Sequence, residues 1–209
     1  MLRKMAVSSV CSSQLEQLRA IDDYVKQLFR KDPTGHDYYH MKRVSRLAKK
    51  IAEKEGADLF ICEAGALLHD VGDRKLFDSP ELAKKHMFQF LRSIHFSEER
   101  ISKLYEAIKD TSFSKGQVPS SLEGKVIQDA DRIDAIGAIG IARTFAFGGA
   151  KGQLIYDEEN PEKTSIQHFY DKLLLLKDQL NTEFAKVIAE ERHLFLEQFL
   201  KRFHSEMGP

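Results

Sequence analysis

Four residues of the kinds that bind metal ions are spread along this chain of 209 residues: His40, the adjacent pair His69 and Asp70, and Asp131. Each lies in or at the end of a segment whose apolar spacing predicts a helix. Two imidazoles and two carboxylates together suit a divalent cation of hard to borderline character. Such a cation would keep positions open for a water and a phosphate oxygen, so these residues indicate metal-assisted hydrolysis.

Each of these residues taken alone also fits a structural role. His40 lies at the edge of an apolar helical stripe, where a partly buried structural histidine is the simpler explanation. His69 and Asp70 follow the apolar run 64–68, where His69 could cap helix carbonyls and Asp70 could begin a turn. Burying an unpaired charge is costly, however, and a cation would compensate both side chains at once.

The segment around Asp131 carries several charged groups among apolar residues. The charged residues are Asp129, Asp131, Arg132 and Asp134. Arg132 could form an ion pair with one carboxylate, and metal ligation explains the remaining carboxylates more economically.

Helical periodicity dominates the chain, and no segment shows the alternation of a strand. We expect helices over residues 14–29, 36–55, 58–70, from 79, 97–110, from about 121, 164–180 and 182–205. The glycine-rich residues 148–162 are either a lid over a site or a plain surface connection. The expected architecture is all-α, with a flexible N-terminus at 1–13 and a single helical domain at 14–209. Its core motif region covers about 36–135 and its C-terminal helices 163–206.

The balance of charge excludes some classes of function. Lys plus Arg and Asp plus Glu both number 32, so a strongly basic nucleic-acid or membrane-binding surface is not expected. No run reaches the roughly 20 apolar residues of a membrane span, and no signal-peptide core is present, so we expect a cytoplasmic protein. Neither Cys11 nor Cys62 belongs to a CxxC motif, which argues against a thiolate zinc site.

Longer segments around the four residues resemble the HD-domain superfamily of metal-dependent phosphohydrolases, in its branch of small stand-alone bacterial proteins. The matching segments are HDYYHMKRV at 36–44, LLHD at 67–70, KVIQDADR at 125–132, AIGIAR at 138–143 and HFYDKLL at 168–174. The similarity covers about residues 20–200. It implies a helical bundle whose metal ligands come from separate helices.

The resemblance assigns roles to particular residues. His40, His69, Asp70 and Asp131 match the ligand positions of one divalent cation, with Mn, Mg, Co, Ni and Fe all allowed. Asp131 matches better than Asp129, which would then orient a ligand histidine. Arg132 and Asp134 would hold their helix in place. The chain departs from the family at Thr111, where related proteins often have a histidine.

Other residues near the motifs are candidates for catalysis or substrate binding. Asp70 and Asp73 are the catalytic candidates, and Asp73 is either a water-positioning base or a turn aspartate. Lys75, next to Arg74, and Arg43, on the same helical face as His40, could bind phosphate. His36 is either a proton shuttle or, more simply, a structural residue.

The resemblance therefore implies a metal-dependent phosphohydrolase that cleaves nucleoside triphosphates to monophosphate and pyrophosphate. A nucleotide phosphomonoesterase or phosphodiesterase is the alternative enzyme, and a non-catalytic nucleotide-binding regulatory module is the alternative class. A structural bundle would leave His69, Asp70 and Asp131 unexplained. The expected partner is a small phosphate ester or nucleotide, with no stable nucleic-acid complex, no membrane, and a monomer or homodimer as the assembly.

Overall fold

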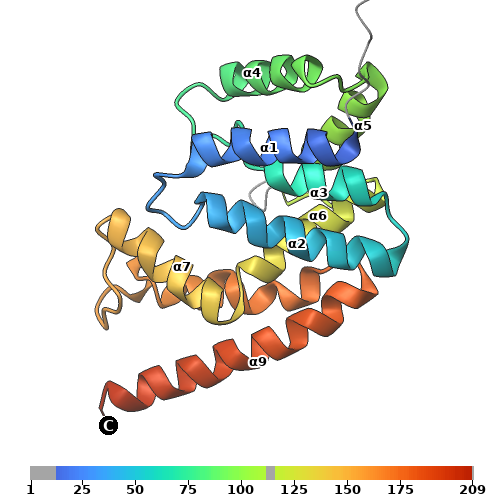
Figure 1. Ribbon diagram of the computed structural model, residues 1–209. Helices are drawn as coiled ribbons and strands as arrows, with labels where there is room; N and C mark the ends of the chain where they lie inside the picture. The colour runs from blue at the N-terminus through green and yellow to red at the C-terminus, as the bar shows by residue number, and fades with distance from the viewer. Residues whose placement is uncertain (1–12, 112–115, 209) are drawn as a thin grey trace, which may run out of the picture.

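The computed structural model describes residues 13–111 and 116–208, and within these residues every regular element is a helix (Figure 1). The first six α-helices are α1 (Gln14–Phe29), α2 (Tyr38–Glu55), α3 (Leu59–Leu68), α4 (Pro80–Ser93), α5 (Glu98–Ile108) and α6 (Leu122–Asp134). After α7 (Gly137–Ala150) come η2 (Pro161–Lys163), α8 (Gln167–Asp171), η3 (Leu173–Leu175), η4 (Lys177–Gln179) and α9 (Glu183–Glu206). The all-α prediction is confirmed.

Local capping fixes the helix ends that carry the candidate ligands. The Asp37 carboxylate accepts a hydrogen bond from the backbone N–H of His40 at 2.8 Å, which starts α2 and puts His40 in its first turn. Asp58 caps α3 in the same manner, accepting from the N–H of Ile61 at 3.1 Å. Between them, Gly56 ends α2 at a φ of 74°, a left-handed conformation that glycine adopts without a steric cost.

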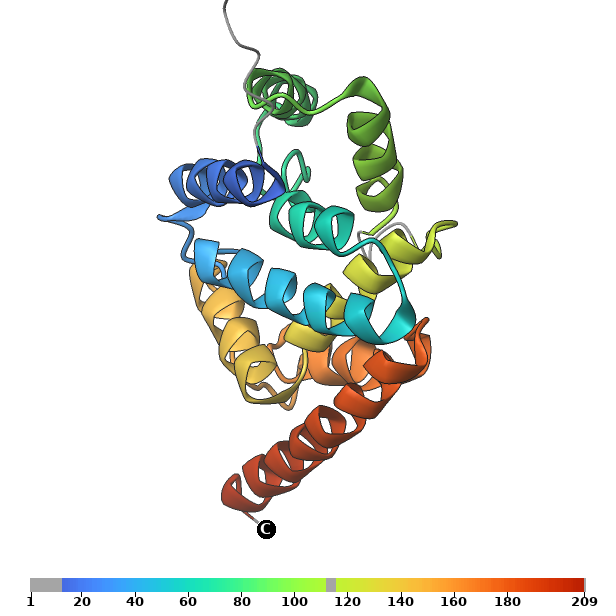
Figure 2. The same ribbon diagram turned by 45° about the vertical axis from the view of Figure 1, so that its right-hand side comes forward.

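The apolar helix α3 lies at the centre of the N-terminal half of the bundle. It packs against α1, α2, α5 and α6, and Figure 2 shows it between α1 and α5, beside α2. A β-carbon added at Gly65 of α3 would lie 2.5 Å from Ile127 Cδ1 and 3.2 Å from Ile108 Cγ2. This close approach holds the end of α3, and with it His69 and Asp70, against α6.

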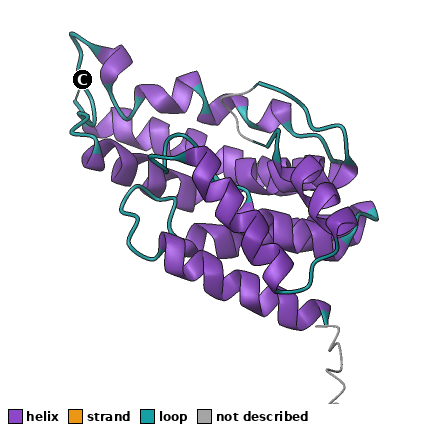
Figure 3. Cartoon of the chain, turned by 90° about the horizontal axis from the view of Figure 1, so that it is seen from above, coloured by secondary structure: helices purple, strands orange, loops and turns teal. Residues whose placement is uncertain are grey.

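The C-terminal helix α9 closes the other side of the molecule. It packs against α2, α6 and α7, as Figures 1 and 2 show. The view from above in Figure 3 shows that the described elements are helices joined by loops. Ala185, Ala189, His193, Leu196 and Leu200 form its buried face. The buried Asp129 carboxylate of α6 accepts hydrogen bonds from the backbone N–H groups of Asn181 and Thr182 and from the Thr182 hydroxyl, at 2.7–3.1 Å. Asp129 thus anchors the start of α9.

Most of the predicted helices are confirmed, with small shifts at their ends. The helix predicted from residue 36 begins at Tyr38 because Asp37 is its cap, and α7 continues to Ala150, which shortens the loop predicted at 148–162. Of the N-terminal residues 1–13 that were predicted to be flexible, residues 1–12 lie outside the described residues, and Ser13 caps α1.

The single long helix predicted at 164–180 is wrong. This segment is broken into α8, η3 and η4, and the break falls at Lys172, whose backbone has φ −139° and ψ −58°. Phe169, Leu173, Leu176 and Leu180 are all buried, so their helical spacing is real, but the core they fill is irregular. Tertiary packing outweighs the local helix propensity here.

By length and composition, no single described helix could span a membrane. Among the described helices, α6 and α7 are long and apolar enough only when they are taken together, and this pair is bent by 74°.

The tight contact at Gly65 predicts that Gly65→Val lowers the free energy of unfolding by about 1–3 kcal/mol through overpacking. Gly149→Val is the matched control, because a β-carbon at this α7 glycine meets nothing within 4 Å. The midpoints of urea denaturation measure both effects. Equal midpoints for the two variants would show that α3 and α6 do not depend on this contact.

Candidate metal centre

The fold brings the four predicted ligands together from three separate helices. His40 comes from the first turn of α2, His69 and Asp70 from the end of α3, and Asp131 from α6. His40 Nε2 lies 3.6 Å from Asp70 Oδ2 and 3.6 Å from Asp131 Oδ1. His69 Nε2 lies 3.4 Å from Asp70 Oδ1 and 3.7 Å from Asp131 Oδ1. Two nitrogens and three carboxylate oxygens therefore converge on one small space.

Both imidazoles are oriented by hydrogen bonds on their far side. His40 Nδ1 lies 2.8 Å from Asp134 Oδ2, and His69 Nδ1 lies 2.8 Å from the carbonyl oxygen of Ala66. In each ring this leaves Nε2 as the nitrogen that faces the carboxylates, an arrangement common around metal-binding histidines. Both Nε2 atoms are buried and lack a hydrogen-bond partner among the described residues. Because such a group costs about 1–3 kcal/mol when buried alone, the site fits a divalent cation.

The charges of the site are strongly coupled. Burial alone would raise the pKa of Asp70, but His69, His36 and His40 outweigh it and hold this pKa well below its ordinary value. Burial would lower the pKa of His69, whereas the carboxylates of Asp70 and Asp131 raise it to about 9. A metal ligand must be a neutral imidazole, so a cation that binds here displaces a proton from His69.

Asp134 orients His40, a role that the sequence suggested for Asp129. Only 1% of its side chain is exposed, and it contacts His40 and two guanidinium groups. Arg43 donates to both of its oxygens at 2.8 and 3.1 Å, and Nη1 of Arg143 donates at 3.1 Å. These contacts hold the pKa of Asp134 at about 2 against the effect of its burial. The expectation that Asp129 orients a ligand histidine is thus corrected, since Asp129 anchors α9.

Two cavities meet at the metal centre. The larger, of about 440 Å³, is lined by His69, Val71, Gly72, Asp73, Arg74, Lys75, Glu81, Lys84, Met87, Tyr105, Ile108, Lys109 and Thr111. The smaller, of about 220 Å³, is lined by Thr34, His36, Lys75, Asp131, Ala135, Gly140, Arg143, Thr144, Phe147, Gln153, Ser165, His168, Lys172 and Leu173. Lys75 is common to both linings.

The remaining predicted site residues have different surroundings. Asp73 faces the larger cavity, and its Oδ1 also accepts a hydrogen bond from the backbone N–H of Lys75 at 2.8 Å, so it also stabilises its turn. Arg43 is held by Asp134 and belongs to neither lining. Arg132 donates to the carbonyl of Gln179, in agreement with its predicted structural role. Thr111 is buried in the wall of the larger cavity with His69, and it donates to the Ile108 carbonyl at 2.9 Å.

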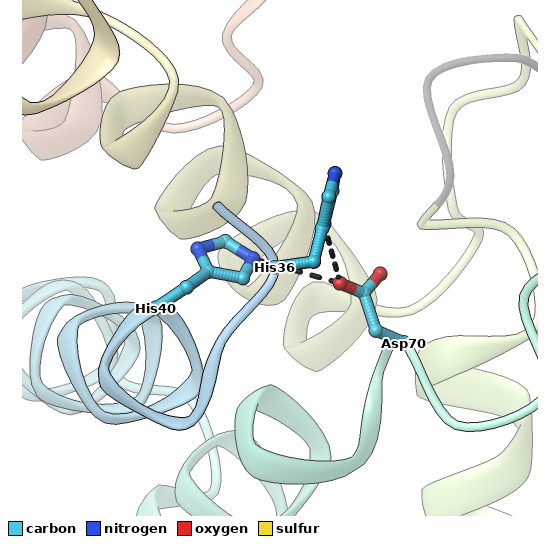
Figure 4. Close-up of side chains that lie close together, drawn as sticks. All are labelled: His36, His40 and Asp70. Carbon is cyan, nitrogen blue, oxygen red and sulfur yellow. Dashed lines mark hydrogen bonds and ion pairs between the residues drawn. The ribbon is translucent and has the colours of Figure 1, made fainter. Parts of the chain in front are cut away.

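His36 lies closer to the centre than its position in the sequence suggested. It precedes the cap of α2, yet its Nδ1 lies 3.0 Å from Asp70 Oδ2, as Figure 4 shows beside His40. His36, His40 and Asp70 form a second group whose donor atoms lie within 4.8 Å of one another. In the sequence, the spacing HxxxH was the feature that could have indicated this position of His36. Arg143 and Lys172, which line the smaller cavity, were harder to identify, because their only distinctive feature is a basic side chain within an apolar segment.

The contacts of Asp134 predict that Asp134→Asn weakens cation binding by about 10- to 100-fold, because His40 loses a charged hydrogen-bond partner. Asp129→Asn is the control: it removes another buried carboxylate of α6, but one that contacts α9 rather than a histidine. Calorimetric titration of metal-free protein with Mn²⁺ gives both affinities. Equal losses in the two variants would contradict the orienting role of Asp134.

Comparison with known proteins places this geometry in a family. The family model for the HD domain matches residues 37–136. The Bacillus subtilis protein YpgQ is 42% identical over 198 residues, which cover 93% of this chain and 95% of YpgQ.

Solved structures agree with this relationship. A crystal structure of Bacillus subtilis YpgQ in complex with ADP matches with a TM-score of 0.82 at 41% identity, covering 92% of this chain and 96% of that one. The crystal structure of an HD-superfamily hydrolase from Bacillus thuringiensis matches with a TM-score of 0.77 at 45% identity, covering 93% and 98%. With the ordered histidines and aspartates of the centre, these matches show that the chain belongs to the HD-domain family.

Proposed function

We propose that this protein is a metal-dependent phosphohydrolase that cleaves nucleoside triphosphates to nucleoside monophosphate and pyrophosphate. The observation that carries the proposal is the position of the centre between two cavities. His69 lines the larger cavity, His36 and Asp131 line the smaller, and Lys75 lines both. A substrate can therefore extend from the reacting phosphorus in two directions.

This arrangement favours one bond over its alternatives. Attack at the α-phosphorus places a nucleoside on one side of the centre and two further phosphates on the other, and so uses both cavities. A phosphomonoesterase has its reacting phosphate at the end of the substrate and needs only one cavity beyond the metal. The crystal structure of YpgQ with ADP supports a nucleotide as the ligand class.

The ligand set also limits the metal. His40, His69, Asp70 and Asp131 would hold one divalent cation, and a mixture of imidazoles and carboxylates suits Mn, Fe, Co or Ni better than Mg alone. When bound, such a cation polarises a phosphoryl oxygen and lowers the pKa of a bound water. Manganese is our first choice for reconstitution.

The protein's own groups would supply the rest of the chemistry. Lys75, at the junction of the cavities, is placed to neutralise charge on the reacting phosphate. Asp73 faces the same region and would accept a proton from the attacking water. Asp70, whose low pKa keeps it ionised, would act as a ligand that stays unprotonated throughout. Arg43, held by Asp134, would contribute by keeping His40 in place rather than by contacting the substrate.

The product pattern tests the reaction. Purified protein loaded with Mn²⁺, Mg²⁺, Co²⁺ or Ni²⁺ is incubated with nucleoside tri-, di- and monophosphates, and pyrophosphate and phosphate are quantified separately. We expect pyrophosphate without free phosphate from triphosphates, and loss of turnover by at least about 1,000-fold in His69→Ala with Asp70→Ala. Phosphate from monophosphates would favour the phosphomonoesterase, and no turnover with bound metal would favour a regulatory module.

Asp73 is tested by a substitution that keeps its turn. Asp73→Asn retains an oxygen that can accept from the Lys75 N–H but removes the base, so we expect kcat to fall by about 100-fold or more with little change in Mn²⁺ affinity. Asp78→Asn, at an exposed aspartate of the same loop, is the control. An unchanged kcat in Asp73→Asn would leave this residue with its turn role alone.

A further inference from the structure

We propose that the two cavities divide the substrate in a fixed direction: the larger cavity binds the nucleoside, with Tyr105 against its base, and the smaller cavity binds the leaving diphosphate through Lys172 and Arg143. This assignment rests on the proposed function and adds to it the orientation of the substrate and the residues that select it.

The cavity assigned to the nucleoside is the larger of the two, as this assignment requires. The larger one, about 440 Å³, falls within the range of about 300–1,000 Å³ that is usual for organic ligands. The smaller one, about 220 Å³, lies below that range and suits a compact group such as a diphosphate. The bulkier half of a nucleoside triphosphate is its base and ribose.

The wall of the larger cavity is suited to a planar base. Tyr105 of α5 belongs to this wall and is 39% exposed overall, and its ring makes an edge-to-face contact with Phe88 at a centroid distance of 5.6 Å, which limits its rotation. Met87 and Ile108 add an apolar surface that is almost fully buried. A held, partly exposed aromatic ring beside apolar side chains can stack on a base, and every base presents a flat face to it.

Both cavities have cations in their linings, and they differ in how these cations are held. In the larger cavity Lys84 is paired with Glu81 at 3.0 Å and Lys109 with Glu106, and Asp73 is a further carboxylate beside Arg74 and Lys75. The smaller cavity has Lys75, Arg143 and Lys172 in its lining, and Asp131, a candidate metal ligand, is the one carboxylate among its described lining residues. Arg143 and Lys172 are half-buried and line the smaller cavity alone, so an oligophosphate there would meet two cations from separate segments.

The cations of the smaller cavity are crowded. Burial lowers the pKa of Lys172, an effect that Asp131 opposes and that Lys75 and Arg143 increase, and burial together with Lys172 lowers the pKa of His168. An anion bound between these groups would relieve their repulsion. Arg143 is already oriented, since its Nε donates to the Gly35 carbonyl at 2.8 Å and its Nη1 to Asp134. Little side-chain entropy is lost when it binds a phosphate.

Binding of the two products to Mn²⁺-loaded protein tests this direction without turnover. Adenosine monophosphate and pyrophosphate are titrated separately by calorimetry into the wild type, Tyr105→Ala and Lys172→Met. We expect Tyr105→Ala to raise the Kd for adenosine monophosphate on the order of tenfold and to leave that for pyrophosphate unchanged. Lys172→Met should raise the Kd for pyrophosphate by a similar factor and leave that for adenosine monophosphate unchanged.

Three further variants serve as controls. Tyr105→Phe keeps the ring and should bind like the wild type, and Tyr170→Ala and Lys163→Met change exposed residues outside both linings. Thermal melting of each variant shows that it is folded. The reversed pattern, equal losses of both ligands, or no loss in either variant would overturn the assignment. Failure of the proposed function is a separate result, because it appears as absent pyrophosphate release by the wild type.

Discussion

The buried carboxylate of Asp134 is the contact on which the candidate centre depends. It lies at the end of α6 and contacts His40 and Arg43 of α2 and Arg143 of α7. Removing one partner from such a buried group typically costs about 3–5 kcal/mol, because the other charges stay buried without compensation. The same carboxylate therefore holds three helices together and fixes the ring of His40, a candidate metal ligand, so stability and the geometry of the candidate centre are coupled.

The orientation of the two imidazoles follows from different parts of the fold. His40 is oriented by a side chain 94 residues away, whereas His69 is oriented by the carbonyl of Ala66 in its own helix. The Nε2 atoms of both rings are left buried, and neither has a hydrogen bond to any residue that the structure describes. The protein thus stores an unfavourable arrangement at this point, and a bound cation would convert it into a favourable one.

The sequence was sufficient to identify the candidate ligands but not the residues that orient them. His40, His69, Asp70 and Asp131 were found because motif spacing and burial cost are local properties, and the capping residues Asp37 and Asp58 made most helix boundaries predictable. Asp129 and Asp134 could not be distinguished, since both are aspartates of one helix and their roles depend on whether α9 or α2 lies opposite. The contact between Arg43 and Asp134 could not be predicted for the same reason.

The one wrong helix is informative about the smaller cavity. A continuous helix over 164–180 would place residues 168 and 172 one turn apart on a regular surface. In the structure, the break at Lys172 lets Phe169, Leu173 and Leu176 fill the core while His168 and Lys172 line the cavity. The irregular backbone thus serves two constraints that a straight helix does not serve together: an apolar core on one side and a cationic wall, next to Asp131, on the other. The backbone thus departs from a regular helix at the place where His168 and Lys172 line the smaller cavity.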